Sequence, residues 1–357
     1  MAQTFIVKGD IVANPSGNTI GRAQFVRITA TADVTGTVLD TDDTQLGQFY
    51  LENGDTYKTI IEKKYFEEAE TTLAQFAGAE KTTTFITANF SSAFQNFLIH
   101  LPRDLHFLVL EDEYPSLTGI VDDLGFTSKK LPVSTAVEEA VWEELHKNSY
   151  AVLTLSAVQY TSGLYFDFDA LSRIKKAFPS LIILIDGTQF LGAEVFSLRE
   201  SPVDAIFGST YKWLLAGHGT GYAMLKPSLL SHLNISEEKL AATYDRGQLS
   251  IKSVGSLVFS LKQIIAADFP KLIQYKKQLS TRMFEELKNR GLLSEEIAQR
   301  SLHSSIYNLQ INEFVYRGLL EKNVRCIKRG EGVRVAVHHY NTQEDITTFF
   351  KIIDALF

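Results

Sequence analysis

The clearest pattern in this chain is a series of short, nearly continuous apolar runs separated by stretches in which charged and apolar residues mix at helical spacing. Helical spacing predicts helices at residues 59–76, 135–147 and 168–178, and Gly78 is placed to end the first of them. The apolar runs predict strands at residues 83–87, 106–110, 126–133, 150–155, 181–185, 203–207 and 221–225. Short apolar strands that alternate with helices are typical of a mainly parallel sheet covered on both faces. We therefore predict an α/β fold with a mostly parallel seven-stranded sheet.

The two ends of the chain differ from this alternating region. Residues 1–40 contain a turn cluster at 14–18 and short β-prone pieces, and we interpret them as an irregular N-terminal arm. Residues 41–250 then form the large domain, and residues 251–357 form a small C-terminal α/β domain with its linking helix. Within this last part we expect a long helical stretch at about 251–287, a final helix after 341–344, and strands at 305–310, 324–328 and 333–338.

Composition narrows the class of protein. At 357 residues and 45% hydrophobic content the chain can bury a large core. The net charge of −7 gives no reason to expect nucleic acid as a partner. The single cysteine, Cys326, excludes an internal disulfide and a cysteine-rich zinc site. The N-terminus lacks a signal-peptide pattern, and no apolar stretch approaches the ~20 residues of a membrane-spanning helix, so we expect a cytoplasmic protein without a membrane partner.

Two polar residues follow apolar runs and suggest chemistry. Asp186 ends the run at 181–185, and Lys212 lies 26 positions later in the segment SPVDAIFGSTYKWLLAGHGTGYAML. Taken alone, each has a plain interpretation, as a turn-capping aspartate and a solvated lysine. However, ligands of parallel sheets gather beyond the carboxyl ends of the strands, and bulky apolar neighbours make a lysine amine more nucleophilic. A carboxylate and an amine are the groups that a pyridoxal phosphate enzyme needs most.

The lysine segment resembles that of class V aminotransferase-fold pyridoxal phosphate enzymes, a fold-type I superfamily that includes kynureninases, cysteine desulfurases and several aminotransferases. The resemblance implies that Lys212 carries the cofactor as a Schiff base and that Ser209 and Tyr211 bind its phosphate. The sequence Asp-Gly-Thr-Gln that begins at Asp186 is similar to the Asp-x-x-Gln pattern of the superfamily. Asp186 would then keep the ring nitrogen protonated, and Gln189 would reach the phenolic oxygen of the ring.

Two further segments extend the resemblance to the cofactor site. The segment ITANFSSA at residues 86–93 follows a predicted strand and opens a helix, whose N-terminus can bind phosphate. An ordinary serine cap is the competing interpretation. Asn89, Phe90 and Ser91 occupy the phosphate-binding position of the family, although Asn89-Phe90 departs from its usual sequence. Tyr114 follows the next strand, where the family places an aromatic ring on the cofactor face; a buried structural tyrosine is the alternative.

The remaining motifs concern the substrate. Residues 156–163 resemble a family loop whose second position is commonly His or Asn, but this chain has Ala157 there. Gln159 and Thr161 are both candidates for the missing contact. The segment GVRVAVHHYNT resembles the C-terminal motif of the family, which implies that Arg334 binds the substrate α-carboxylate. A surface-strand arginine is the alternative.

Other polar residues of the chain carry less information. His338 and His339, which follow in the same segment as Arg334, have no acidic or cysteine partner at metal-ligand spacing, so we expect no metal. The resemblance implies a homodimer with active sites at the subunit interface. Gln248 stands where many relatives have a threonine that reaches the phosphate of the neighbouring subunit.

These motifs favour a transaminase that acts on α-amino acids. A kynureninase-like hydrolase or another pyridoxal phosphate lyase is the main alternative. A cysteine desulfurase is disfavoured, because the only candidate nucleophile, Cys326, is predicted to lie in a strand rather than on a loop. The departures at Asn89-Phe90, Ala157 and Gln248 keep a non-catalytic relative open. An NAD-dependent dehydrogenase is a weaker alternative, since no Gly-x-Gly-x-x-Gly opens the first strand–helix unit.

Overall fold

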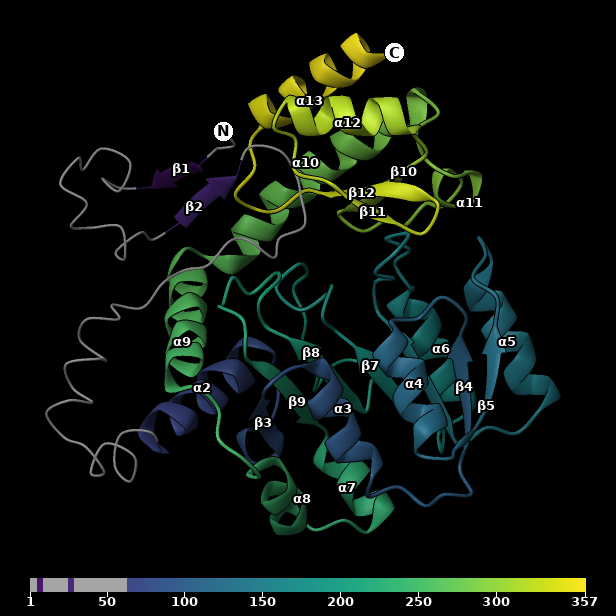
Figure 1. Ribbon diagram of the computed structural model, residues 1–357. Coiled ribbons are helices and arrows are strands. Elements are labelled where there is room, and N and C mark those ends of the chain that lie inside the picture. The colour runs from purple at the N-terminus through teal and green to yellow at the C-terminus, as the bar shows by residue number, and fades with distance from the viewer. Residues whose placement is uncertain (1–4, 9–24, 29–62) are drawn as a thin grey trace, which may run out of the picture.

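A seven-stranded sheet forms the centre of the larger part of the molecule (Figure 1). The computed structural model describes residues 5–8, 25–28 and 63–357. In sheet order the strands are β3 (Thr84–Thr87), β9 (Gly221–Leu225), β8 (Ala205–Ser209), β7 (Ile182–Asp186), β6 (Val152–Ser156), β4 (His106–Leu110) and β5 (Thr127–Leu131). The pairs from β8 to β5 are parallel, and only β9 runs antiparallel to its neighbours β3 and β8. The predicted mostly parallel sheet is confirmed.

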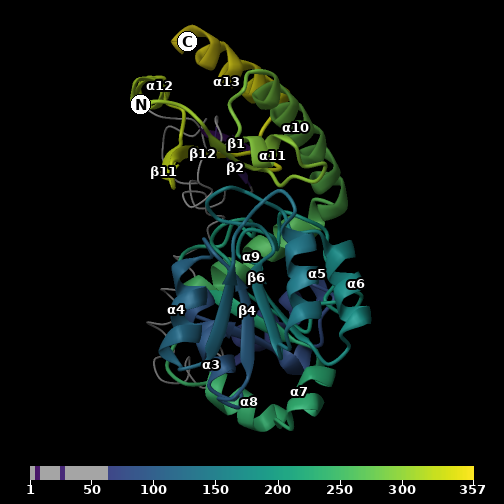
Figure 2. The same cartoon turned by 90° about the vertical axis from the view of Figure 1, so that its right-hand side faces the viewer.

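Helices cover both faces of this sheet, because its strands are apolar on both sides (Figure 2). On β7, Ile182 and Leu184 face one core cluster, whereas Ile183 and Ile185 face the other. The first cluster includes residues of α3 (Phe90–Leu98), α4 (Pro115–Asp123), α7 (Pro227–Leu233) and α8 (Glu237–Tyr244). The second includes residues of α2 (Lys63–Phe76), α5 (Val137–Lys147), α6 (Phe168–Ala177) and α9 (Ile251–Ala266).

The C-terminal part carries a small sheet of its own. Its antiparallel strands, in sheet order, are β10 (Ile306–Leu309), β12 (Gly332–Ala336) and β11 (Ile327–Arg329). Helix α10 (Phe269–Asn289) leads from α9 to this part, which is completed by α11 (Glu295–Ala298), α12 (Glu313–Glu321) and α13 (Gln343–Leu356) (Figure 1). The helical stretch expected at 251–287 is thus two helices. The chain turns at Asp268, whose φ of 60° is left-handed, and Pro270 lies in the first turn of α10.

Most other differences from the predicted elements are small shifts at their ends. The strand expected at 203–207 is β8 at Ala205–Ser209, and the one expected at 324–328 is β11 at Ile327–Arg329. Helix α2 ends at Phe76, and Gly78 follows with a left-handed φ of 57°, as its position predicted. Helices α4, α7, α8, α11 and α12 were not predicted.

The predicted N-terminal arm is described only in part. Within it, β1 (Phe5–Lys8) and β2 (Phe25–Ile28) pair as antiparallel strands, and the rest of the arm lies outside the described residues. The predicted start of the first helix, at residue 59, also lies outside them. No helix in the described part of the chain combines the length and apolar character needed to cross a membrane.

Candidate active site

Three parallel strands end at one edge of the large sheet, and each places a polar side chain there. Strand β6 ends at Ser156, β7 at Asp186 and β8 at Ser209, and Ser156 pairs in register with Asp186. A cavity of about 190 Å³ lies beyond this edge. It is lined by Asn89, Phe90, Ser91, Tyr114, Ser156, Val158, Tyr160, Asp186, Thr188, Gln189, Ser209, Tyr211 and Lys212. The structure therefore brings together nine of the eleven predicted site residues.

Asp186 is a buried carboxylate held by its own turn. The backbone N–H of Thr188 donates to its Oδ1 at 2.8 Å, and only 7% of the residue is exposed. Burial raises the pKa of Asp186 to about 6, although the bonds from Thr188 and the positive charge of Lys212 oppose that shift. The carboxyl is therefore mostly ionised at neutral pH, in a site where little water screens it. It can accept a hydrogen bond from a protonated ring nitrogen.

Tyr222 lies on β9 and adds a buried polar atom near this carboxylate. Its hydroxyl has no hydrogen-bond partner among the described residues. Burial raises the pKa of this hydroxyl, and the negative charge of Asp186 adds a smaller increase. Glycine is required on the neighbouring strands, because a Cβ at Gly208 would lie 2.3 Å from the Tyr222 hydroxyl.

Lys212 lies in the connection between β8 and β9, where apolar and polar contacts fix the backbone. The next residues, Trp213 and Leu214, are each 1% exposed. Helix α9 holds the connection, because the Ser260 hydroxyl donates to the carbonyl of Leu214. The Lys212 Nζ lies 5.8 Å from the centre of the Tyr211 ring. The sequence thus places an amine on the cavity next to buried apolar side chains, an environment that favours a nucleophilic lysine.

The N-terminus of α3 reaches the same cavity. Asn89 caps the helix by accepting from the Ser92 N–H at 2.9 Å, and Ser92 bonds back to the Asn89 N–H at 3.2 Å. The N–H of Phe90 donates to the Ser209 hydroxyl at 3.1 Å, which ties the helix to the end of β8. A helix N-terminus with neighbouring hydroxyls favours an anion such as phosphate. In this chain the unusual Asn89-Phe90 pair therefore supplies the helix cap.

Aromatic rings gather on another side of the cavity. Tyr114 is 40% exposed, so the alternative of a buried structural tyrosine is wrong. Its ring meets Phe90 edge-on with centroids 6.0 Å apart and Tyr160 edge-on at 5.7 Å. The structure thus leaves Tyr114 accessible for contact with a bound ring system.

Glu113, which the motifs did not single out, is a second buried carboxyl beside the cavity. It accepts from the Ser156 N–H at 2.8 Å, from the Ser156 hydroxyl and from the Gln159 side chain at 2.9 Å. Burial raises the pKa of Glu113 to about 8; the bonds from Ser156 oppose the shift and nearby Asp186 adds to it. The acidic run at 111–113 after a strand was a signal for such a residue. Glu113 holds the loop that follows β6.

Thr161 and Arg334, the two residues predicted on the substrate side, do not line the cavity. The Thr161 carbonyl accepts from Asn308 at 2.9 Å, while Gln159 is engaged by Glu113. Arg334 is buried on β12 and donates to the carbonyl of Tyr160, a lining residue. Thr161 and Arg334 therefore border the cavity through the 156–163 loop, and their predicted roles stay predictions. The lining residues that the prediction omitted are Ser156, Val158, Tyr160 and Thr188.

The residues present fit pyridoxal phosphate. The cofactor needs an amine for its aldehyde, an acid for its ring nitrogen and an anion site for its phosphate. Lys212, Asp186 and the first turn of α3 supply these three groups on one cavity. Among the described residues, no three His, Cys, Asp or Glu side chains group as metal ligands.

Comparison with known proteins decides the family. The sequence pattern of class V aminotransferases matches residues 24–349. The chain belongs to the class V aminotransferase family. An uncharacterized aminotransferase of Bacillus subtilis, YcbU, is 23% identical over 316 residues, which cover 83% of this chain and 84% of that protein. Kynureninase of Saccharomyces cerevisiae is 32% identical over 76 residues, 21% of this chain and 17% of the kynureninase.

Several solved structures share the fold of this chain. The cystine C–S lyase C-DES, in complex with cysteine persulfide, has a TM-score of 0.77 at 16% identity and covers 91% of this chain and 97% of its own. A cysteine desulfurase from Thermococcus onnurineus has a TM-score of 0.73 at 15% identity, and the match covers 100% of this chain and 99% of the desulfurase. The predicted fold-type I architecture is confirmed, as is the predicted cofactor, since this family depends on pyridoxal phosphate.

Proposed function

We propose that this class V family member is an aminotransferase that acts on α-amino acids. The observation that supports it most is the joint placement of Lys212 and Asp186 on a cavity that also receives the N-terminus of α3. An amine, a buried carboxylate and an anion site in one small cavity match the three reactive parts of the cofactor. Family membership and an aminotransferase relative over most of the chain support the same activity.

The proposed chemistry divides between the cofactor and this chain. When bound, pyridoxal phosphate supplies an aldehyde that condenses with amines and a ring that accepts electrons from the substrate carbon. Lys212 would hold the cofactor through Nζ and would act as the base that moves a proton to and from the substrate α-carbon. Asp186 holds the proton on the ring nitrogen, which keeps the ring able to accept electrons.

The other predicted residues bind and orient. Gln189 would contact the phenolic oxygen and Tyr114 would cover one face of the ring. Arg334 with the adjacent loop would bind the substrate carboxylate, and Thr161 is a candidate contact on that loop. The proposed phosphate ligands are Asn89, Phe90, Ser91, Ser209 and Tyr211.

The position of Cys326 argues against the desulfurase alternative. The prediction that Cys326 lies in a strand is wrong, because the residue directly precedes β11. It nevertheless does not line the cavity. Burial raises the pKa of its thiol to about 12, so the nucleophilic thiolate is scarce at neutral pH. A desulfurase needs that thiolate to attack the substrate sulfur. The likeness to desulfurase structures therefore supports the shared fold and not this reaction.

Bond cleavage without a nucleophilic cysteine is the second candidate function. One observation favours it: the short match to a kynureninase, which is 32% identical over 76 residues. Such a lyase or hydrolase would use the same Lys212 and Asp186, because both reactions begin with proton removal at the α-carbon. The two candidates differ in their co-substrate, since an aminotransferase requires a 2-oxo acid and a lyase does not.

A product assay with an amino-acid panel tests the proposal. Purified protein loaded with pyridoxal phosphate should convert an α-amino acid only when a 2-oxo acid is present. Lys212→Ala should reduce that rate on the order of 10²–10⁴-fold, whereas Lys271→Ala, which removes an exposed lysine, should not. Turnover without a 2-oxo acid would contradict transamination in favour of bond cleavage. No spectral response to any amino acid would indicate a non-catalytic relative.

The remaining expectations complete the proposal. We infer a cytoplasmic homodimer with a large domain at 41–250 and a small domain at 251–357. Gln248 is exposed on the loop after α8, where a partner subunit could meet it. Light scattering of the loaded protein should give twice the monomer mass of 40.0 kDa.

A further inference from the structure

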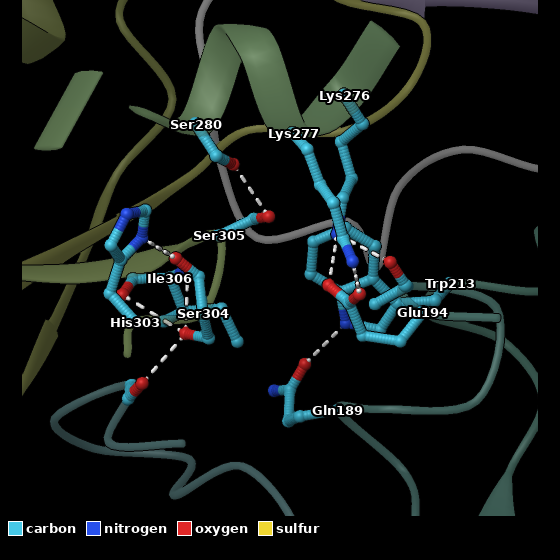
Figure 3. A network of polar contacts seen from close by, with 12 residues as sticks. Gln189, Glu194, Trp213, Lys276, Lys277, Ser280, His303, Ser304, Ser305 and Ile306 are labelled. Atoms are coloured by element: carbon cyan, nitrogen blue, oxygen red, sulfur yellow. Dashed lines mark hydrogen bonds and ion pairs between the residues drawn. The ribbon is translucent and has the colours of Figure 1, made fainter. Parts of the chain in front are cut away.

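Gln189 makes a hydrogen bond that fixes which end of its amide faces the cavity. The indole N–H of Trp213 donates to Gln189 Oε1 at 2.9 Å, and both residues are buried. An indole nitrogen can only donate, so the amide atom that faces it must be the oxygen. The amide nitrogen of Gln189 therefore points away from Trp213 (Figure 3). Since Gln189 lines the cavity, this orientation offers a donor to a bound ligand.

A buried ion pair holds the other side of Trp213. Lys276, on α10, is fully buried, and its ammonium lies 5.3 Å from the centre of the Trp213 ring system. That ammonium also donates to the carbonyl of Ala193. It further donates to Glu194 Oε1 at 2.9 Å (Figure 3). Breaking such a pair leaves an uncompensated charge, so its geometry is strongly constrained. Lys276 thus gives the indole a fixed, charged neighbour.

Two further contacts confine the indole. The His338 ring, just beyond β12, stacks on Trp213 with centroids 4.9 Å apart and planes 10° apart. Gly192 approaches so closely that a Cβ there would lie 2.8 Å from the Trp213 carbonyl carbon, and its φ of 91° also requires glycine. Trp213 is therefore fixed by the turn after β7, by α10 and by the C-terminal part at once.

We propose that Trp213 is a positioning residue that holds Gln189 as a hydrogen-bond donor toward the phenolic oxygen of bound pyridoxal phosphate, with the Lys276–Glu194 pair holding Trp213. This inference rests on the proposed cofactor site. Without the indole N–H, the Gln189 amide could turn and present its oxygen to the phenolic oxygen, where two acceptors repel. The contact would then change from attraction to repulsion without any change in Gln189 itself.

The bound cofactor reports this contact through its visible absorbance. The phenolic oxygen shares a proton with the Lys212 nitrogen that is bound to the cofactor. A hydrogen bond donated to this oxygen weakens its hold on that proton. Losing the donor strengthens the hold on that proton, so the midpoint of the absorbance–pH titration should rise. Cofactor affinity should also fall roughly three- to tenfold, the range of one lost hydrogen bond.

Trp213→Phe in the full-length protein tests the proposal, because it removes the N–H and keeps an aromatic ring. Trp142→Phe is the matched control, since Trp142 is the other tryptophan of the chain and lies 38% exposed on α5. Absorbance titrations with pH and equilibrium titrations of the apo protein with pyridoxal phosphate are measured for each variant. We expect the raised midpoint and weaker binding in Trp213→Phe only. A Trp213→Phe titration identical to that of the control would overturn the proposal.

A double-mutant cycle separates positioning from general damage to the fold. Gln189→Leu should raise the titration midpoint itself, and adding Trp213→Phe should then change it no further. If Trp213→Phe shifts the midpoint as much in the Gln189→Leu background as in wild type, Trp213 does not act through Gln189. That result would also overturn the proposal.

Lys276→Met provides a second route if the phenylalanine variant does not fold. Methionine has a similar length without the charge, and Glu194 keeps Lys277, at 3.1 Å, as a partner. We expect a smaller midpoint shift in the same direction, absent in the Gln189→Leu background; no shift, or one that persists there, contradicts the role of the pair. A wild-type protein that shows no visible band with pyridoxal phosphate would instead refute the proposed function.

Discussion

The cavity has one wall built within the large sheet and another that joins two sheets. On the first wall, Asp186 and Ser209 lie at the ends of neighbouring strands, and the N-terminus of α3 is tied to Ser209. On the second, the 156–163 loop lies between the large sheet and β12, and Arg334 reaches the cavity lining through the carbonyl of Tyr160. Under the proposed function, the first wall would hold the cofactor and the second would contact the substrate.

Contacts across the second wall are close. Ser304 donates to the carbonyl of Gly163 at 2.6 Å, and a Cβ at Gly163 would lie 2.1 Å from the carbonyl oxygen of Ile306. A buried ion pair between Arg300 and Glu138, 2.5 Å long, joins the C-terminal part to α5. The loop position therefore depends on how the two parts pack. Substitutions on the two walls should consequently have different signatures.

The largest effect is expected on the first wall, at Asp186. Asp186→Asn keeps the shape of the side chain but removes the charge that holds a proton on the ring nitrogen. We expect kcat to fall on the order of 10²–10³-fold, with little change in KM for the amino acid. Steady-state kinetics measure this, with Asp122→Asn, an exposed aspartate, as the control. A change confined to KM would remove the difference between the walls.

The next effect concerns Glu113, which ties the two walls through Ser156 and Gln159. Its pKa is raised from 4.5 to about 8, so the buried neutral form stabilises the fold fully below pH 4.5, and this contribution is lost as the pH rises through about 8. In the apo protein, Glu113→Gln should remove that loss, which is on the order of 4 kcal/mol between pH 5 and pH 9.

Urea unfolding at several pH values measures this effect. Between pH 5 and pH 9 the wild type should lose more unfolding free energy than Glu113→Gln, while the exposed Glu139→Gln should follow the wild type. Parallel curves for all three proteins would show that Glu113 is not held neutral by burial.

The smallest effect is expected on the second wall, at Arg334. Arg334→Lys keeps the charge but loses the planar fork that binds a carboxylate through two hydrogen bonds. We expect KM for the amino acid to rise about tenfold, the equivalent of 1.4 kcal/mol, with pyridoxal phosphate affinity nearly unchanged. Arg317→Lys, at an exposed position on α12, is the control. An equal loss of cofactor affinity would show that the walls are not separate.

The two walls of the cavity also differ in how well the sequence predicts their residues. Asp186 and Lys212 each follow an apolar run, so local pattern placed them at the correct edge of the sheet. Thr161 was assigned by spacing within a loop motif, and spacing does not determine which side chains of a loop turn inward; in the structure Tyr160 lines the cavity instead. Glu113 and Trp213 act through contacts with residues 43 and 24 positions away. Such pairs follow from packing and leave no periodic signal.

Mass spectrometry after borohydride reduction can identify the amine that binds pyridoxal phosphate. Reduction makes the bond between pyridoxal phosphate and a lysine amine permanent, and peptide mapping then identifies the lysine. We predict one modified site, Lys212, in the wild type and none in the Lys212→Ala variant. Modification at another lysine, or none in wild-type protein that has been saturated with cofactor, would contradict this prediction.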